Sequence, residues 1–117
     1  MGPYLGVENF MRLYHNPRCS KSREAVQILQ ELNIEFEIHE YIKNGIHPDD
    51  IDNLSRLPSI IRINEGLYKE NEIDIEDYSA IKNLLLNHPK LLQRPILVDQ
   101  NRCVIGRPAE NILTLLP

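Results

Sequence analysis

The chain has 117 residues, which is within the usual range of one domain, so we expect a single compact core. It is 42% hydrophobic, and no apolar run approaches the roughly 18 residues that a membrane span requires, so we expect no membrane association. The formal net charge is −4 and the Lys and Arg residues are scattered, which argues against nucleic acid as a partner. These properties favour a small-molecule or protein partner.

The two cysteines, Cys19 and Cys103, are too few for a disulfide framework. The N-terminus also lacks the charged segment and apolar stretch of a secretory signal, so we expect the reducing environment of the cytoplasm. Residues 1–10 carry no periodic pattern, and we interpret them as a tag or disordered leader. The domain itself is predicted to run over residues 11–117.

The sequence of the first part of the domain predicts a strand, a helix and a second strand. Residues 11–14 form the first strand, and a loop leads to an amphipathic helix that ends near Asn33. Ser20 or Ser22 is the expected cap of this helix. Apolar and polar residues alternate over 34–39, which predicts a strand with one buried face. This order is typical of a βαβ unit.

The middle of the chain predicts helices and no strand. One helix is expected from Pro48 to Leu54, a second short helix from Pro58, and a longer helix from about Ile75 to Leu86. A segment of about fifty residues is marginal as an independent domain, so we interpret residues 45–90 as a helical insertion beside the sheet.

The last part of the chain predicts a hairpin and a final helix. Residues 94–98 are rich in β-branched and apolar side chains and predict a buried strand, followed by a turn at 99–101 and a return strand at 103–105. The final amphipathic helix carries Ile112, Leu113, Leu115 and Leu116. The fold class is therefore α/β, with a mixed sheet flanked by helices.

Cys19 is the clearest candidate for chemistry. It lies at the predicted start of a helix, where unpaired N–H groups and the positive end of the dipole favour a thiolate. Arg18, Lys21 and Arg23 add positive charge, and His15 is close enough to lower the thiol pKa if it is protonated. A buried structural cysteine is the alternative, but apolar neighbours are lacking, so we favour a reactive thiol.

Three arginines, Arg62, Arg94 and Arg107, lie near the ends of predicted loops or elements. A guanidinium group binds tetrahedral oxyanions well because its planar fork presents several fixed donors. Arg94 and Arg107 each precede a proline and so have extended backbones that can direct them into one pocket. Arg62 has an alternative interpretation as a solvated helix residue. Pro95, which opens a strand, is the proline we expect to be cis.

Several motifs together resemble the ArsC family of arsenate reductases. The residues are Tyr14-His15-Asn16-Pro17-Arg18-Cys19-Ser20-Lys21-Ser22-Arg23, and the likeness continues through Ile60-Ile61-Arg62, His88-Pro89, Arg94-Pro95-Ile96 and Gly106-Arg107-Pro108. The resemblance implies a thioredoxin- or glutaredoxin-like fold with an inserted helical region. It spans nearly the whole chain from Met11 onward.

The resemblance also implies roles for particular residues. Cys19 would be the nucleophile, while His15 and Ser22 would assist thiolate formation. The family's oxyanion-binding arginines correspond to Arg62, Arg94 and Arg107, and its cis-proline to Pro95. The implied reaction reduces arsenate to arsenite through a covalent Cys19 adduct, with glutathione as co-substrate, glutaredoxin as redox partner and no bound cofactor.

Two alternatives to this activity remain open. One is a regulator of the Spx type, which binds RNA polymerase; such proteins usually carry Cys-x-x-Cys in this loop, whereas Ser22 stands three residues after Cys19, so a dithiol switch here is excluded. The other is a thiol reductase that acts on a different small substrate. Cys103 is interpreted as a small core residue rather than a resolving thiol.

The histidines give no sign of a metal site. His39, His47 and His88 have no paired metal-ligand spacing with one another or with the cysteines, so we interpret them as surface or capping residues and expect no bound metal.

Overall fold

The structure is a computed structural model that describes residues 11–116, so the leader predicted for residues 1–10 lies outside the described residues. The chain divides into two compact units, one from Met1–Glu40 and Arg94–Pro117 and the other from Tyr41–Gln93. The helical stretch predicted at about 45–90 falls in the second unit, and the prediction of a single domain over 11–117 stays a prediction. Within residues 11–116, no helix has the length and apolar character needed to cross a membrane.

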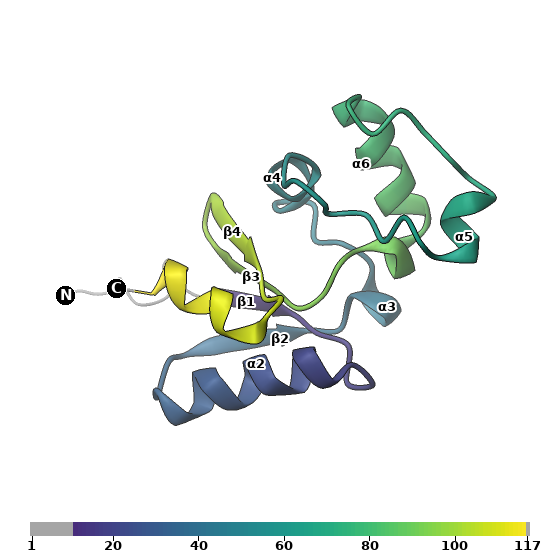
Figure 1. Ribbon diagram of the computed structural model, residues 1–117. Helices are drawn as coiled ribbons and strands as arrows, with labels where there is room; N and C mark the ends of the chain where they lie inside the picture. The colour runs from purple at the N-terminus through teal and green to yellow at the C-terminus, as the bar shows by residue number, and fades with distance from the viewer. Residues whose placement is uncertain (1–10, 117) are drawn as a thin grey trace. The chain divides into compact units, whose positions relative to one another are not determined.

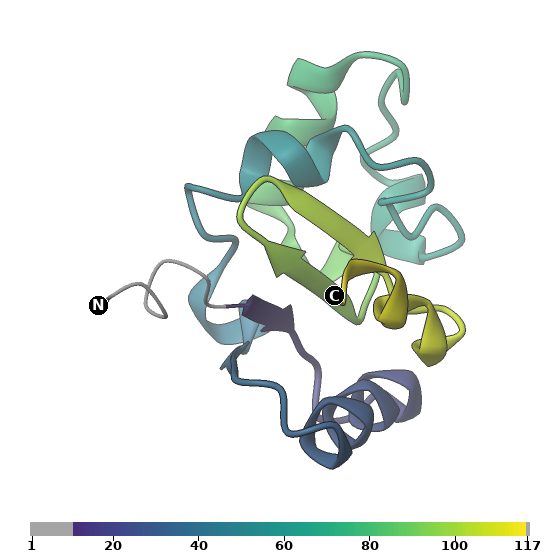
Figure 2. The same cartoon turned by 90° about the vertical axis from the view of Figure 1, so that its left-hand side faces the viewer.

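The first unit contains a mixed four-stranded sheet with the order β2-β1-β3-β4 (Figure 1). Its strands are β1 (Met11–Tyr14), β2 (Phe36–His39), β3 (Ile96–Asp99) and β4 (Arg102–Ile105). β2 runs parallel to β1, whereas β3 and β4 continue the sheet antiparallel. The predicted βαβ unit and the predicted hairpin, which faces the viewer in Figure 2, are both confirmed.

Helix α2 (Ser20–Glu31) and the 3-10 helix η2 (Ala109–Leu115) pack on this unit's core. Leu13 and Leu97, which are paired in the sheet register, face Ala25 and Leu29, which lie four residues apart on one side of α2. Ile112 of η2 completes this cluster and is fully buried. The core therefore fixes α2 against β1, and with it the loop that joins them.

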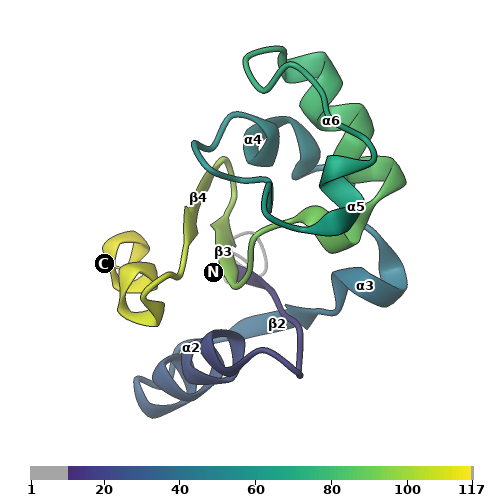
Figure 3. The same ribbon diagram turned by 45° about the vertical axis from the view of Figure 1, so that its right-hand side comes forward.

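The second unit is helical (Figure 3). It consists of α3 (Tyr41–Asn44), α4 (Ile51–Ser55), α5 (Gly66–Lys69), α6 (Tyr78–Asn87) and the 3-10 helix η1 (Pro89–Leu91). α6 packs against α4 and η1. An isolated antiparallel bridge joins Ile61 to Leu92, close to one of the candidate arginines.

Several helix boundaries in the second unit differ from the prediction. α4 begins at Ile51 rather than Pro48, because residues 47–50 form a turn closed by the bond from Asp50 N to His47 O. No helix begins at Pro58: the next residue, Ser59, has φ 61°, which no helical residue adopts. α6 begins at Tyr78 rather than Ile75, and α3 was not predicted.

The ends of the first unit also correct the prediction. The last helix is a 3-10 helix, in which Ile112 and Leu115 are buried but Leu113 is 43% exposed. Ile38, which the alternation placed on a buried face, is 47% exposed. Its strand β2 is an edge strand, so the side chain of Ile38 has neighbouring side chains of the sheet on one side only.

Candidate active site

Cys19 is the N-cap of α2. Its backbone is extended, with φ −96° and ψ 122°, and its carbonyl accepts the first helical hydrogen bond from Arg23 N at 3.0 Å. The prediction that Ser20 or Ser22 caps the helix was therefore wrong. Cys19 N donates to Asn16 O at 2.9 Å, which closes the loop below the thiol. As the N-cap, Cys19 lies at the positive end of the dipole of a twelve-residue helix. The residue is half-buried, so it is not closed off from solvent.

Ser22 joins this loop to the first turn of α2. Its side chain is fully buried, and its Oγ accepts a hydrogen bond from Asn16 N at 3.0 Å. The same oxygen lies 2.9 Å from His15 Nδ1, and His15 N donates to His39 O at 3.0 Å. These bonds hold the loop against the helix that begins at Cys19 and bring His15 and Ser22 together, while their part in thiolate formation stays a prediction.

The environment of Cys19 lowers its pKa. Burial raises the pKa, but the N–H of Ser22, the guanidinium of Arg94 and the N–H of Lys21 together lower it by more, and the charge of Arg94 adds to the effect. The side chain of Cys19 makes no regular capping hydrogen bond. The lowered pKa instead reflects the attraction of nearby donors for the thiolate, so Cys19 forms a thiolate more readily than an ordinary cysteine does.

His15 does not supply the positive charge. Its pKa is lowered by burial, a change that the charge of Glu40 opposes and the charge of Arg23 reinforces, so the neutral imidazole is favoured. The effect of a protonated His15 on the thiol pKa, expected from the sequence, thus stays a prediction for a form that this environment disfavours. The cation that acts on Cys19 is Arg94, which is distant from it in the sequence.

Two of the cations that lie near Cys19 in the sequence, Arg23 and Lys21, have other partners. Arg23 donates from Nη1 to Pro17 O at 2.8 Å, and Lys21 lies 3.6 Å from the carboxylate of Glu24. Their side chains stabilise the loop and the first turn of α2 rather than the thiolate.

Arg94 and Pro95 lie immediately before β3, and their peptide bond is cis, the isomer expected from the sequence. The peptide bond between Arg107 and Pro108 is also cis, which was not predicted. Arg107 donates from Nη1 to Arg94 O at 2.9 Å, so the two arginines are in contact. Among the described residues, Arg94 Nε is buried without a hydrogen-bond partner, which leaves a donor for a bound anion.

Arg62 belongs to the second unit. Its guanidinium forms an ion pair with Glu65 at 3.2 Å, and its backbone N donates to Leu91 O at 2.8 Å. The alternative of a solvated helix residue is incorrect, because Arg62 precedes α5 and is only partly exposed. Its role towards a ligand stays a prediction.

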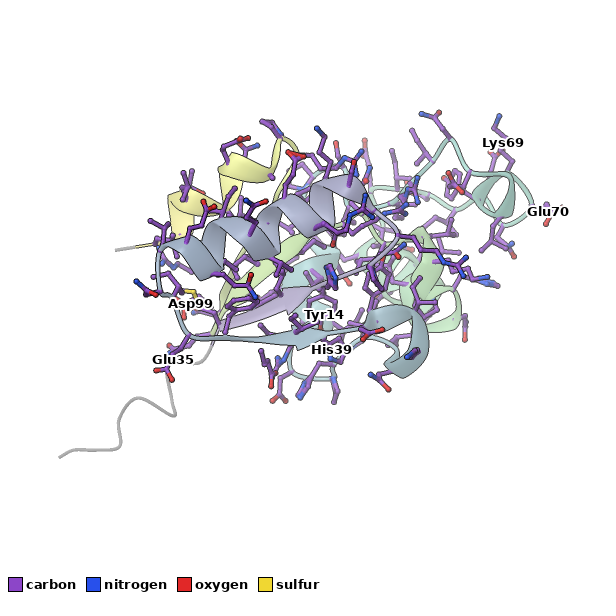
Figure 4. All side chains as sticks on the ribbon, turned by 90° about the horizontal axis from the view of Figure 1, so that it is seen from below. Tyr14, Glu35, His39, Lys69, Glu70 and Asp99 are labelled. Atoms are coloured by element: carbon purple, nitrogen blue, oxygen red, sulfur yellow. The ribbon has the colours of Figure 1, made fainter. Side chains whose placement is uncertain are left out.

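The remaining candidates have other surroundings. Cys103 is half-buried on β4, where it pairs with Val98. The ring of His39 packs on Tyr14 with centroids 4.8 Å apart (Figure 4), and His47 Nδ1 accepts a hydrogen bond from Asp49 N. Across residues 11–116, no cluster of three or more His, Cys, Asp or Glu side chains has the arrangement of a metal site.

Sequence reasoning missed further features of the site. Asn16 was given no role, although its side chain accepts from Arg18 N at 3.0 Å; the Asn-Pro pair is the local signal for such a turn. The contact of Arg107 with Arg94 has no local signal, because the two residues are brought together only by the hairpin. The packing of Gly106 on Pro95 likewise depends on the fold.

Comparison with known proteins identifies the family of the chain. The ArsC family model matches residues 14–115, a range that contains all the candidate site residues. The chain belongs to the ArsC family. An arsenate reductase of Neisseria meningitidis is 38% identical, over 91% of this chain and 97% of that protein.

The ArsC family assignment also fits the fold. A solved arsenate reductase from Vibrio cholerae superposes with a TM-score of 0.79 at 29% identity, over 92% of this chain and 98% of that one, which confirms the thioredoxin-like α/β fold. The global transcriptional regulator Spx 2 of Bacillus anthracis is 30% identical over 90% of this chain and 86% of its own length. Relatives of this ArsC-family protein therefore include both reductases and a regulator.

Proposed function

We propose that this ArsC-family protein reduces arsenate to arsenite through a covalent adduct on Cys19, with glutathione and glutaredoxin as reductants. The observation that carries the proposal is the position of the thiol, which begins α2 beside Arg94 and has a lowered pKa. A thiolate attacks better than a thiol, and Arg94 offers an unpartnered buried donor to an incoming oxyanion. The arsenate reductases among the relatives support the choice of substrate.

The first step forms a sulfur–arsenic bond. The Cys19 thiolate attacks arsenic(V), an arsenic–oxygen bond breaks, and the oxygen leaves as water after taking up protons. Arsenate carries more than one negative charge, so its approach to a thiolate is repulsive unless cations offset it. Arg94 lies at the thiol and Arg107 contacts Arg94, so both guanidinium groups are available to stabilise charge on the oxygens.

The second step transfers the electrons. The sulfur of glutathione attacks Cys19 Sγ, the electron pair of the sulfur–arsenic bond passes to arsenic, and arsenic(III) leaves as arsenite. Cys19 and glutathione are then joined by a disulfide, which glutaredoxin reduces by thiol–disulfide exchange. This route suits a loop with one cysteine, because Ser22 stands where a second thiol would be needed to resolve the adduct internally.

The activity is tested by following NADPH consumption with glutathione reductase, glutathione and a competent glutaredoxin, with arsenate and with other oxyanions. We expect Cys19→Ser to abolish turnover. Arg94→Ala and Arg107→Ala each remove donors to developing charge and should lower kcat/KM by on the order of 10²-fold. Cys103→Ser is the matched control for the thiol and should retain activity. No arsenate-dependent turnover in the wild type, or arginine variants equal to it, would contradict the proposal, and turnover with another oxyanion would identify a different substrate.

A second candidate function is regulation through RNA polymerase, which the similarity to Spx 2 favours. It predicts that tagged protein captures stoichiometric polymerase subunits from a cell lysate and has no reductase activity. Reductase activity without capture of polymerase supports the enzyme instead.

A further inference from the structure

The space around Gly106 is too small for any side chain. The residue is buried, and a Cβ atom placed on it would lie 2.9 Å from Pro95 Cγ and 3.0 Å from Ile112 Cγ2. Real Cβ atoms essentially never show contacts below 3.0 Å. Gly106 is therefore needed for space, and its backbone does not adopt the left-handed conformation that would by itself favour glycine.

The neighbours of Gly106 have little freedom to move aside. Pro95 is among the fully buried residues and has a rigid ring, and Ile112 is fully buried in the core with Leu97 and Ala25. Protein interiors are packed closely, so an added methyl group displaces a neighbour instead of filling a void. Pro95 is the nearer of the two neighbours, so a Cβ atom at position 106 pushes on Pro95 as well as on Ile112.

Two hydrogen bonds join the same segments. Gly106 N donates to Pro95 O at 2.8 Å, and Arg107 Nη1 donates to Arg94 O at 2.9 Å. The Arg94–Pro95 peptide is thus held by a packing contact and by a hydrogen bond at each of its two residues. Asn111 Nδ2 donates to Arg107 O at 3.1 Å and ties this support to η2.

We propose that Gly106 and Arg107 are positioning residues that hold the Arg94–Pro95 peptide where the Arg94 guanidinium meets the Cys19 thiol. Neither residue needs to touch Cys19 for this role: Gly106 supplies close approach and Arg107 supplies a hydrogen bond. Arg107 thereby acts on the free protein, before any oxyanion binds. The inference rests on the proposed role of Cys19 as the nucleophile.

The test is the pH dependence of Cys19 alkylation by iodoacetamide, with peptide mass spectrometry to separate Cys19 from Cys103. In Gly106→Ala we expect the pKa of Cys19 to rise by about half a unit to one unit, a part of the one to three units that a nearby cation contributes. Gly66→Ala is the matched control, because a Cβ atom there meets nothing within 4 Å. It should leave the profile unchanged.

Arg107→Ala provides a second variant, because its side chain is exposed and its loss should not prevent folding, whereas Gly106→Ala can fail to fold. The pKa of Cys19 should rise in this variant as well. Repeating the titration at about 1 M salt distinguishes two causes of the rise in pKa. A rise caused only by loss of the Arg107 charge is screened at this salt concentration, whereas a rise caused by displacement of Arg94 from the thiol persists. His15 favours the neutral form, and Arg23 and Lys21 are engaged elsewhere, so Arg94 is the cation whose displacement the titration follows.

The outcomes separate the inference from the proposed function. If Cys19 of the wild type titrates at or above the roughly 8.5 of a free cysteine, the activated thiol of the proposed function is itself wrong. If the pKa of Cys19 is below that value in the wild type and is the same in a folded Gly106→Ala or Arg107→Ala variant, only the positioning role is overturned. Denaturation in urea establishes which variants are folded.

Discussion

At the scale of single residues, the reactivity of Cys19 depends more on backbone groups than on the basic residues next to it. The N–H groups of Ser22 and Lys21 point to the sulfur because the helix begins there, and they need no particular side chain. Ser22 and His15 contribute by fixing the loop, since neutral His15 is favoured. The helix start that the sequence predicts at Cys19 is present, whereas the effect of Arg94 on the thiol was not predicted.

Ser22→Ala should destabilise the protein by about 1–3 kcal/mol, because a buried hydroxyl that serves two partners is lost. His15 Nδ1 and Asn16 N would be left without this hydrogen-bond partner. Ser20→Ala is the matched control, since Ser20 is exposed on the same turn and such changes usually stay within about 0.5 kcal/mol. The free energy of unfolding in urea measures both, and equal values for the two variants would show that the Ser22 bonds contribute little.

At the scale of elements, periodicity predicted what is regular and missed what depends on caps and turns. The four strands and α2 follow from alternation and from the spacing of Ala25 and Leu29. The short helices of the second unit contain too few residues to show a period. Pro58 was therefore wrongly predicted to begin a helix, although the backbone of Ser59 is in the left-handed conformation. Ile38 was misplaced because alternation alone cannot identify an edge strand.

α6 offers a test of one such cap. Asp77 accepts hydrogen bonds from Ser79 N at 3.0 Å and Ala80 N at 3.3 Å, so Asp77→Ala should destabilise the protein by about 1 kcal/mol. Glu72→Ala removes the same charge from an exposed position outside the helices and is the control. Thermal or urea unfolding compares them, and a control that loses as much stability would assign the effect to net charge rather than to the cap.

At the scale of the whole molecule, the candidate arginines are divided between the units. Arg94 and Arg107 belong to the first unit with Cys19, and Arg62 belongs to the second. The contact between Arg94 and Arg107 crosses from the start of β3 to the end of β4, so only the folded hairpin creates it. The sequence identified all three arginines by their type and position, but it could not show that Arg107 binds the backbone of Arg94 or that Arg62 pairs with Glu65.

The ion pair of Arg62 with Glu65 limits the effect that we expect from Arg62→Ala on kcat/KM. The carboxylate of Glu65 at 3.2 Å already offsets part of its charge, so Arg62 should attract an oxyanion less strongly than Arg94 does. We therefore expect Arg62→Ala to lower kcat/KM for arsenate by about 10-fold, against on the order of 10²-fold for Arg94→Ala. Glu65→Gln removes the competing carboxylate and should raise kcat/KM, but only while Arg62 is present.

Arg56→Ala is the control for Arg62, because it removes an equal charge from the second unit, where Arg56 lies over the ring of Tyr78 with 5.2 Å to its centroid. The coupled assay should show wild-type kcat/KM for Arg56→Ala. If Glu65→Gln has the same effect with and without Arg62, the carboxylate acts on the substrate independently of the arginine. If Arg62→Ala matches Arg56→Ala, Arg62 takes no part in binding the oxyanion, and the recognition of arsenate depends on Arg94 and Arg107 of the first unit.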